Sequence, residues 1–356
     1  MATIKIIPSM IFDAICTIEY LNEHKFQFAP EQIAFSKKIN EFTSGRFKKG
    51  GFGKTNTCLM IASYFGESTE LEKLTLDDLS ELFKDPQNVY NEIIKQCIAF
   101  YGEDYKKHLE EMQFNKIWES EYLSVAVNYS TYINILAEIK FEKLWQSDLL
   151  PIIKEEAKNK EIIYNKLDID STLVDIQKLK KCDLLGDVKI YLSFMSYPTA
   201  LKLPGNSFLS SVDNENYMGA GLICHELMHG FASKDLNSLY LEYIKNNKYL
   251  MEQHDILINN QRSSIEEEFV NAAEYYLRMK HNGEYQKDLL KEAKERYGGC
   301  LPTSVFLFDL LSKEPETPNG YLQWLTDIFI NKKLPQDDIK QHLDNITTES
   351  SINTFA

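Results

Sequence analysis

The segment GLICHELMHGF, residues 221–231, gives the clearest indication of both fold and chemistry in this 356-residue sequence. It contains His225, Glu226 and His229 in the pattern H-E-x-x-H. On an α-helix, residues four apart lie one turn apart on the same face, so both imidazoles can bind one zinc ion. The glutamate beside the first histidine reaches a metal-activated water instead of the metal, which makes Glu226 the expected general base. The segment therefore predicts a helix that carries a zinc site.

Two simpler explanations of this pattern are chance and a buried helix with two hydrogen-bonded histidines. The chain has only seven histidines, and a pattern of this kind arises by chance in about one such chain in a hundred. The neighbouring Leu222, Ile223 and Leu227 are apolar, as expected where a helix crosses a core beneath a metal site. The metal interpretation is therefore favoured, on a helix expected between Tyr217 and Ala232.

A catalytic zinc site needs a third protein ligand. One known extension of the motif places glycine and histidine at the positions that hold Ala232 and Asp235 here, so that form is absent. Asp235 is still a candidate, because carboxylate oxygen binds zinc. Ala232 disfavours it, since the sharp turn before such a ligand prefers glycine.

The segment IEEEFVNAAEYYL, residues 265–277, offers three consecutive glutamates as alternative ligands. On a helix, Glu267 shares one stripe with Asn271 and Glu274, away from the apolar face. We expect Glu267 to bind the metal and Asn271 to hydrogen-bond a zinc-binding histidine, with Glu268 as the alternative ligand. The competing interpretation is a solvated first turn of a helix, where acidic residues are common.

Composition limits the classes of function. A hydrophobic fraction of 44% with 12% aromatic residues predicts a packed globular protein, and a formal charge of −14 disfavours nucleic acid and anionic membranes as partners. The N-terminus lacks a secretory pattern, and no apolar run has the roughly 18 residues needed to span a bilayer. The six cysteines contain no C-x-x-C pair and suggest buried, reduced thiols. These features favour a cytoplasmic location.

Residue patterns predict an α+β fold that is mostly helical, with a small mixed sheet next to the motif helix. Helical periodicity dominates residues 1–182. Strands are expected near KIYLSFMS, residues 189–196, and at NSFLSSVD, residues 206–213, before helical patterns return. Residues 183–356 should form the catalytic region, either as a domain of their own or in one continuous unit with the first half.

The segments CHELMH (224–229) and EEFVNAAEYY (267–276) resemble the gluzincin branch of zinc metallopeptidases, over about Val188 to Lys280. The resemblance implies a zincin-like fold, a zinc cofactor, and hydrolysis of a peptide or protein substrate. It further implies that residues 206–213 form an edge strand along which the substrate lies.

The resemblance also implies a side chain that donates to the oxyanion of the transition state. A tyrosine or a histidine usually has this role. No motif identifies this residue here, and Tyr297 is chosen over His254 and His281.

Two other functions remain open. A zinc-binding scaffold or sensor without catalysis would have the same ligands, although such proteins often lose the general base that Glu226 supplies. The glycine-rich segment KKGGFGKTNT, residues 48–57, resembles a P-loop for nucleotide phosphates. A P-loop follows a buried strand, and the polar segment NEFTSGRF precedes this one, so a surface turn is the preferred interpretation.

Overall fold

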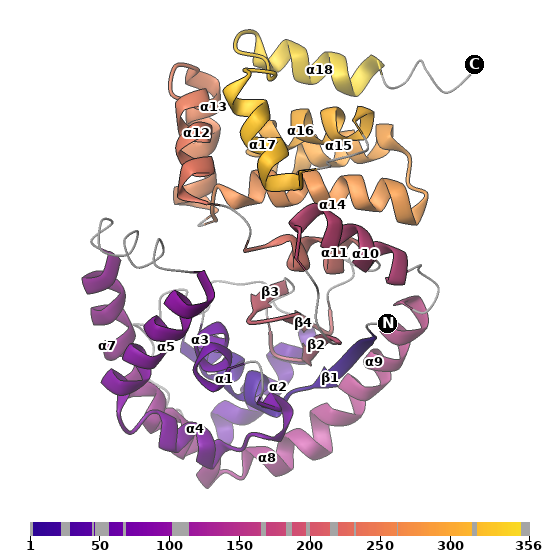
Figure 1. The fold of residues 1–356 in the computed structure, drawn as a ribbon. Helices are drawn as coiled ribbons and strands as arrows, with labels where there is room; N and C mark the ends of the chain where they lie inside the picture. Colours follow the sequence, from indigo (N-terminus) through magenta and orange to yellow (C-terminus); the bar gives the residue numbers. More distant parts are fainter. Residues whose placement is uncertain are drawn as a thin grey trace. The chain divides into compact units, whose positions relative to one another are not determined.

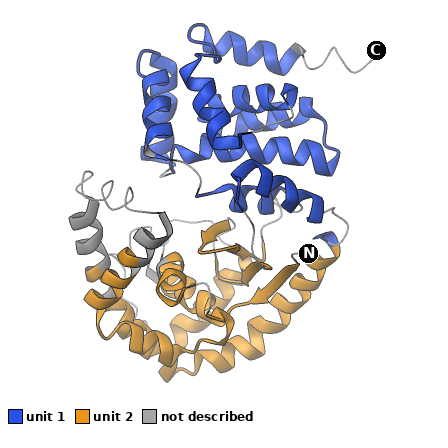
Figure 2. Ribbon diagram, in the orientation of Figure 1, with its two compact units in different colours: residues 1–2, 163–185, 217–356 blue, residues 3–162, 186–216 orange. Residues whose placement is uncertain are grey.

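The computed structural model describes residues 3–22, 29–44, 46, 57–66, 69–101, 114–164, 169–182, 187–196, 200–213, 220–230, 233–261, 263–314 and 319–349. The chain divides into two units (Figures 1 and 2). Unit 1 contains Met1–Ala2, Ile163–Leu185 and Tyr217–Ala356, and unit 2 contains Thr3–Ile162 and Gly186–Asn216. The division therefore differs from the expected boundary at residues 182 and 183, because the strand segment joins the N-terminal half.

The described residues of unit 2 contain a mixed sheet of four strands. The strands are β1 (Ile4–Pro8), β2 (Val188–Ser193), β3 (Ala200–Leu203) and β4 (Ser207–Ser211). Their order is β1-β2-β4-β3, with β2 parallel to both β1 and β4 and with β3 antiparallel to β4. The α+β class and the positions of β2 and β4 are confirmed. The sequence patterns did not indicate β1 and β3, which are only five and four residues long.

The position of β4 corrects the prediction that residues 206–213 form an edge strand. Leu209 of β4 pairs with Tyr191 on one side and with Leu201 on the other. Both sides of β4 are thus used within the sheet, and its backbone is not available to an added strand. The edges of the described sheet are β1 and β3. Because the sheet and the motif helix belong to different units, their predicted proximity stays a prediction.

Helices form most of the rest of the first half of the chain. The mainly helical character expected for residues 1–182 is confirmed for the described residues of this range. The helices are α1 (Met10–Asn22), α2 (Pro30–Phe42), α3 (Thr57–Phe65), the 3-10 helix η1 (Leu71–Lys73), α4 (Leu76–Leu82), α5 (Pro86–Tyr101), α7 (Phe114–Glu138), α8 (Phe141–Leu144), the π-helix η2 (Trp145–Leu149) and α9 (Leu150–Tyr164).

A buried carboxylate links three elements of unit 2. Asp13 of α1 accepts hydrogen bonds from Ser193 Oγ (2.6 Å) and Met195 N (2.7 Å) at Oδ1, and from Trp145 Nε1 (2.7 Å) at Oδ2. Burial outweighs these hydrogen bonds and raises the pKa of Asp13 to about 6. The helix α1, the π-helix η2 and the end of β2 are therefore joined through one side chain.

Unit 1 is helical. Its elements are α10 (Ile169–Lys180), α11 (Ala220–Met228), α12 (Lys234–Ile244), α13 (Lys248–Asp255), the π-helix η3 (Ile256–Asn260), α14 (Glu266–Asn282), α15 (Gln286–Glu295), the 3-10 segment η4 (Arg296–Gly299), α16 (Pro302–Lys313), α17 (Tyr321–Ile330) and α18 (Ile339–Glu349). In Figure 1 the orange α14 lies among them, and it packs against α11, α16, α10 and α15. Residues 267–277 of α14 are all buried. This helix is thus the centre of unit 1.

The helices and the cysteines of the described residues test two further expectations from the sequence. Among the described residues, no helix has the length and apolarity to cross a membrane. Cys16, Cys58, Cys224 and Cys300 are buried as expected, whereas Cys182 is exposed.

Candidate metal centre

The motif helix α11 is anchored by apolar side chains. Leu222, Ile223, Leu227 and Met228 are each at most 3% exposed. The helix ends at Met228, earlier than predicted, and Gly230 follows with a φ of +82°. A glycine in the left-handed conformation is the usual way to end a helix. His229 is therefore the residue at which the chain leaves the helix.

Lys180 of α10 holds this end of the motif helix. Its Nζ donates hydrogen bonds to the backbone carbonyl oxygens of Leu227 (2.8 Å) and His229 (2.7 Å). Carbonyls in the last turn of a helix lack partners within the helix, and a lysine supplies both a donor and a favourable charge there. The backbone of His229 is consequently fixed by a neighbouring helix.

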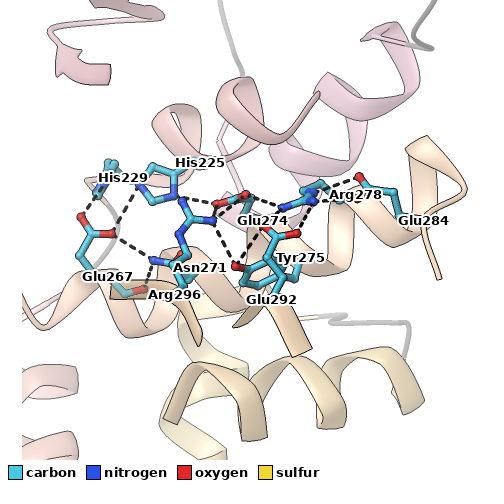
Figure 3. A network of polar contacts seen from close by, with 10 residues as sticks. All are labelled: His225, His229, Glu267, Asn271, Glu274, Tyr275, Arg278, Glu284, Glu292 and Arg296. Atoms are coloured by element: carbon cyan, nitrogen blue, oxygen red, sulfur yellow. Dashed lines mark hydrogen bonds and ion pairs between the residues drawn. The ribbon is translucent and has the colours of Figure 1, made fainter. Parts of the chain in front are cut away.

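His225, His229 and Glu267 come together in space (Figure 3). The two Nε2 atoms are 3.2 Å apart. Glu267 Oε2 lies 3.5 Å from His225 Nε2, and Oε1 lies 3.7 Å from His229 Nε2, both too long for good hydrogen bonds. Ligand atoms about 2.0–2.1 Å from a tetrahedral zinc are about 3.3 Å from one another. The three side chains therefore have the spacing of a metal site, and the group could hold an ion.

The opposite nitrogen of each imidazole faces a carboxylate. His225 Nδ1 lies 3.0 Å from Glu274 Oε2, and His229 Nδ1 lies 3.1 Å from Glu266 Oε2. A carboxylate only accepts, so each Nδ1 carries the proton, and a neutral imidazole has one N–H. When both rings are neutral, the two Nε2 lone pairs point into the same small space and repel each other. A proton on His229 Nε2, donated to His225 Nε2, or a metal cation between the two nitrogens removes that repulsion.

The charge around His229 is strongly negative. Burial lowers its pKa, but the hydrogen bond and charge of Glu266 and the charges of Glu267 and Glu226 outweigh burial and raise it to about 9. Glu226 itself is only 4% exposed. The surroundings of this histidine therefore favour positive charge, either a proton or a metal ion.

Glu274 is held as an ionised carboxylate. It is 1% exposed and receives Arg296 Nη1 at 3.0 and 2.8 Å and Arg278 Nη1 at 3.3 Å. Burial favours the neutral acid, but the charges of Arg296 and Arg278 and the hydrogen bond from His225 lower its pKa to about 2. Such an outer carboxylate fixes the tautomer and the direction of a ligating histidine.

Asn271 borders the site but has a different partner from the one predicted. Its Nδ2 donates to the backbone oxygen of Glu267 (2.7 Å) and to Glu267 Oε2 (3.1 Å). It therefore positions the carboxylate, and Glu274 and Glu266 hold the histidines. The sequence did contain a signal for Glu274, since it follows Glu267 by two helical turns on the same stripe.

The other two candidate ligands lie away from the histidines. Glu268 accepts hydrogen bonds from Tyr240 Oη (3.1 Å) and from Ser304 N (2.7 Å) at the start of α16, and burial raises its pKa to about 8. Asp235 is exposed on the first turn of α12. Neither belongs to the histidine group among the described residues, and Glu267 does.

The candidates for an oxyanion donor are dispersed in unit 1. Tyr297 is partly buried against Leu257, Cys300 and Leu301. His254 lies edge-on to Tyr240, with ring centroids 6.1 Å apart. His281 Nε2 pairs with Asp175 Oδ2 at 2.9 Å. The role of Tyr297 stays a prediction.

The glycine-rich segment falls largely outside the described residues, which resume at Thr57, the start of α3. The interpretation of Lys48–Asn56 as a surface turn is therefore untested.

Comparison of the chain with known protein families, with curated protein sequences and with solved structures found no match.

Proposed function

We propose that this protein is a zinc-dependent peptidase with a zincin-like catalytic region. His225, His229 and Glu267 would hold the ion. The observation that supports this most strongly is the pair of opposed Nε2 atoms, 3.2 Å apart, on histidines whose Nδ1 atoms both face carboxylates. When bound, zinc supplies a Lewis acid that polarises a carbonyl group and lowers the pKa of water.

The ligand set favours a catalytic site over a structural one. Structural zinc sites are closed by four protein ligands, commonly cysteines and histidines, whereas catalytic sites combine three ligands with an open position. Two histidines and one glutamate match the catalytic type. None of the cysteines described belongs to the group.

Glu226 is the proposed general base. It follows His225 directly, it is buried, and its negative charge contributes to the raised pKa of His229. A carboxylate in that position can take a proton from water during attack and give it to the leaving amine. The alternative proposal, a zinc-binding scaffold or sensor without turnover, assigns no chemistry to this residue.

Metal content and peptide cleavage test the proposal together. Elemental analysis of the purified protein should give one zinc per chain, and His225→Ala and His229→Ala should each lose it. His342→Ala, at an exposed histidine of α18, is the matched control and should keep the ion. Stoichiometric zinc in the His225 and His229 variants would contradict the proposed site.

A library of quenched fluorescent peptides tests turnover. The wild-type protein should cleave members of the library, a chelator should stop cleavage, and added zinc should restore it. A zinc-loaded protein that cleaves nothing in the library would favour the scaffold or sensor.

A further inference from the structure

Glu274, which faces His225, is itself held by a residue outside the motif helix and outside α14. Arg296 follows α15 directly, and its side chain is 9% exposed. Its Nη1 lies 3.0 Å from Glu274 Oε1 and 2.8 Å from Oε2, so one nitrogen contacts both oxygens (Figure 3). The same nitrogen lies 3.3 Å from Tyr275 Oη. A chain of contacts thus runs from Arg296 through Glu274 to the histidine ring.

The backbone at this point has an uncommon conformation. Tyr297, Gly298 and Gly299 have φ angles of +52°, +70° and +82°. A tyrosine disfavours the left-handed region and adopts it where surrounding contacts hold it there. Tyr297 packs against Leu257, Cys300 and Leu301, and this turn separates α15 from α16. The turn therefore places Arg296 beside α14 at the cost of local strain.

The second arginine cannot replace this contact. Arg278 Nη1 reaches Glu274 Oε1 at 3.3 Å and does not bridge both oxygens. Its guanidinium is instead paired with Glu284 at 2.7 Å and with Glu292 at 2.7 and 2.8 Å. Without Arg296, the buried carboxylate would lose its closest cation and could turn away from His225. The imidazole could then move its proton to Nε2, the atom that must bind the metal.

We propose that Arg296 is a positioning residue of the metal centre, which acts through Glu274 to keep the Nε2 lone pair of His225 directed at the ion. This inference rests on the proposed function for the identity of the ion. The positioning of the ring can be measured without it.

Zinc affinity is measured by competition with a fluorescent chelator. Arg296→Met removes the charge and keeps an apolar stem, and it should weaken zinc binding about 10- to 100-fold, as loss of an outer partner does at other metal sites. Arg296→Lys should recover most of the affinity, because a single nitrogen makes both carboxylate contacts. Lys294→Met removes a surface charge of α15 that pairs with Asp344 at 2.5 Å, and it should bind zinc as the wild type does.

A measurement of which imidazole nitrogen carries the proton tests the role of Arg296 independently of the proposed function. In the metal-free protein, ¹⁵N NMR of the histidine rings should show His225 with its proton on Nδ1 in the wild type and in Arg296→Lys. In Arg296→Met the Nε2–H form should be populated. If Arg296→Met does not fold, Arg296→Gln takes its place with the same expectations.

Different results would contradict the proposed function and the role of Arg296. Wild-type protein that binds no zinc would refute the proposed function, and the ring measurement would still decide the role of Arg296. A wild-type zinc affinity and an unchanged His225 signal in Arg296→Met would overturn the inference. So would an Arg296→Lys variant as weak as Arg296→Met, because it would show that charge at this nitrogen does not matter.

Discussion

The Nε2 atoms of His225 and His229 are closer to each other, at 3.2 Å, than either is to the Glu267 carboxylate, at 3.5 and 3.7 Å. Glu274 and Glu266 hold the two rings from their Nδ1 sides, so both Nε2 atoms face the same space. An ion bound there stabilises the folded protein, since it binds the native arrangement and not the unfolded chain.

Metal removal should therefore lower thermal stability. At a free zinc concentration 100 times Kd, the expected stabilisation is about 2.7 kcal/mol. A chelator should lower the Tm of the wild type and leave the Tm of His225→Ala unchanged, as measured by calorimetry. Equal shifts in both proteins would contradict a site at these histidines.

Substitution of Glu226 and of Glu267 by glutamine should affect zinc binding and peptide cleavage differently. Glu226→Gln keeps the shape but cannot accept a proton, so zinc should stay bound while cleavage falls about 100-fold or more. Glu267→Gln removes a charged ligand, so zinc affinity and activity should fall together. Elemental analysis and peptide cleavage on the same samples distinguish the two. Wild-type turnover by Glu226→Gln would refute the mechanism, and full zinc affinity in Glu267→Gln would refute the ligand assignment.

The glutamates on either side of Glu267 provide a matched pair. Glu266 faces His229 Nδ1 and accepts from Gly230 N at 2.9 Å, whereas Glu268 is turned toward Tyr240 and Ser304. Glu266→Ala should weaken zinc binding about 10-fold or more. Glu268→Gln should leave zinc affinity near the wild-type value. The reverse order of affinities in chelator competition would show that the first turn of α14 is oriented differently.

Gly221 allows α11 to approach the network around Glu274. A Cβ at this position would lie 3.1 Å from Arg278 Cδ and 3.4 Å from Glu274 Oε1. Gly221→Val should destabilise the protein by about 1–3 kcal/mol, because Arg278 is fixed by Glu284 and Glu292 and cannot easily move. Urea unfolding measures this, and the loss should shrink in an Arg278→Ala background if the two side chains collide. If the destabilisations caused by Gly221→Val and Arg278→Ala simply add, the two side chains do not collide.

Asp13 should make stability depend on pH. Its folded pKa of about 6 lies above the ordinary value of 3.8, so the native state binds the proton more tightly than the unfolded chain does. This contribution is complete below about pH 4 and is lost as the pH rises through 6, a change of about 3 kcal/mol at about 1.4 kcal/mol per pKa unit. Urea unfolding of the wild type and Asp13→Asn at several pH values should show this slope only in the wild type. If the free energies of unfolding of the wild type and Asp13→Asn change with pH in parallel, the pKa of Asp13 in the folded protein lies near its ordinary value.

The features of this protein that follow from local spacing can be predicted from the amino-acid sequence alone. The four-residue step between His225 and His229 and the stripe from Glu267 to Glu274 both follow from helical periodicity. The strand patterns at β2 and β4 were also local. These features involve residues within a few turns of one another, whose geometry the helix or strand alone fixes.

Contacts between residues far apart in the chain become visible only in the folded structure. β1 pairs with β2 across more than 180 residues, and β4 lies inside the sheet because β3 covers its other side. Glu274 reaches His225 across 49 residues, and Arg296 completes that contact from a strained turn after α15. Local patterns do not encode such pairings, because they depend on which surfaces the folded chain buries together and on which buried charges it must neutralise.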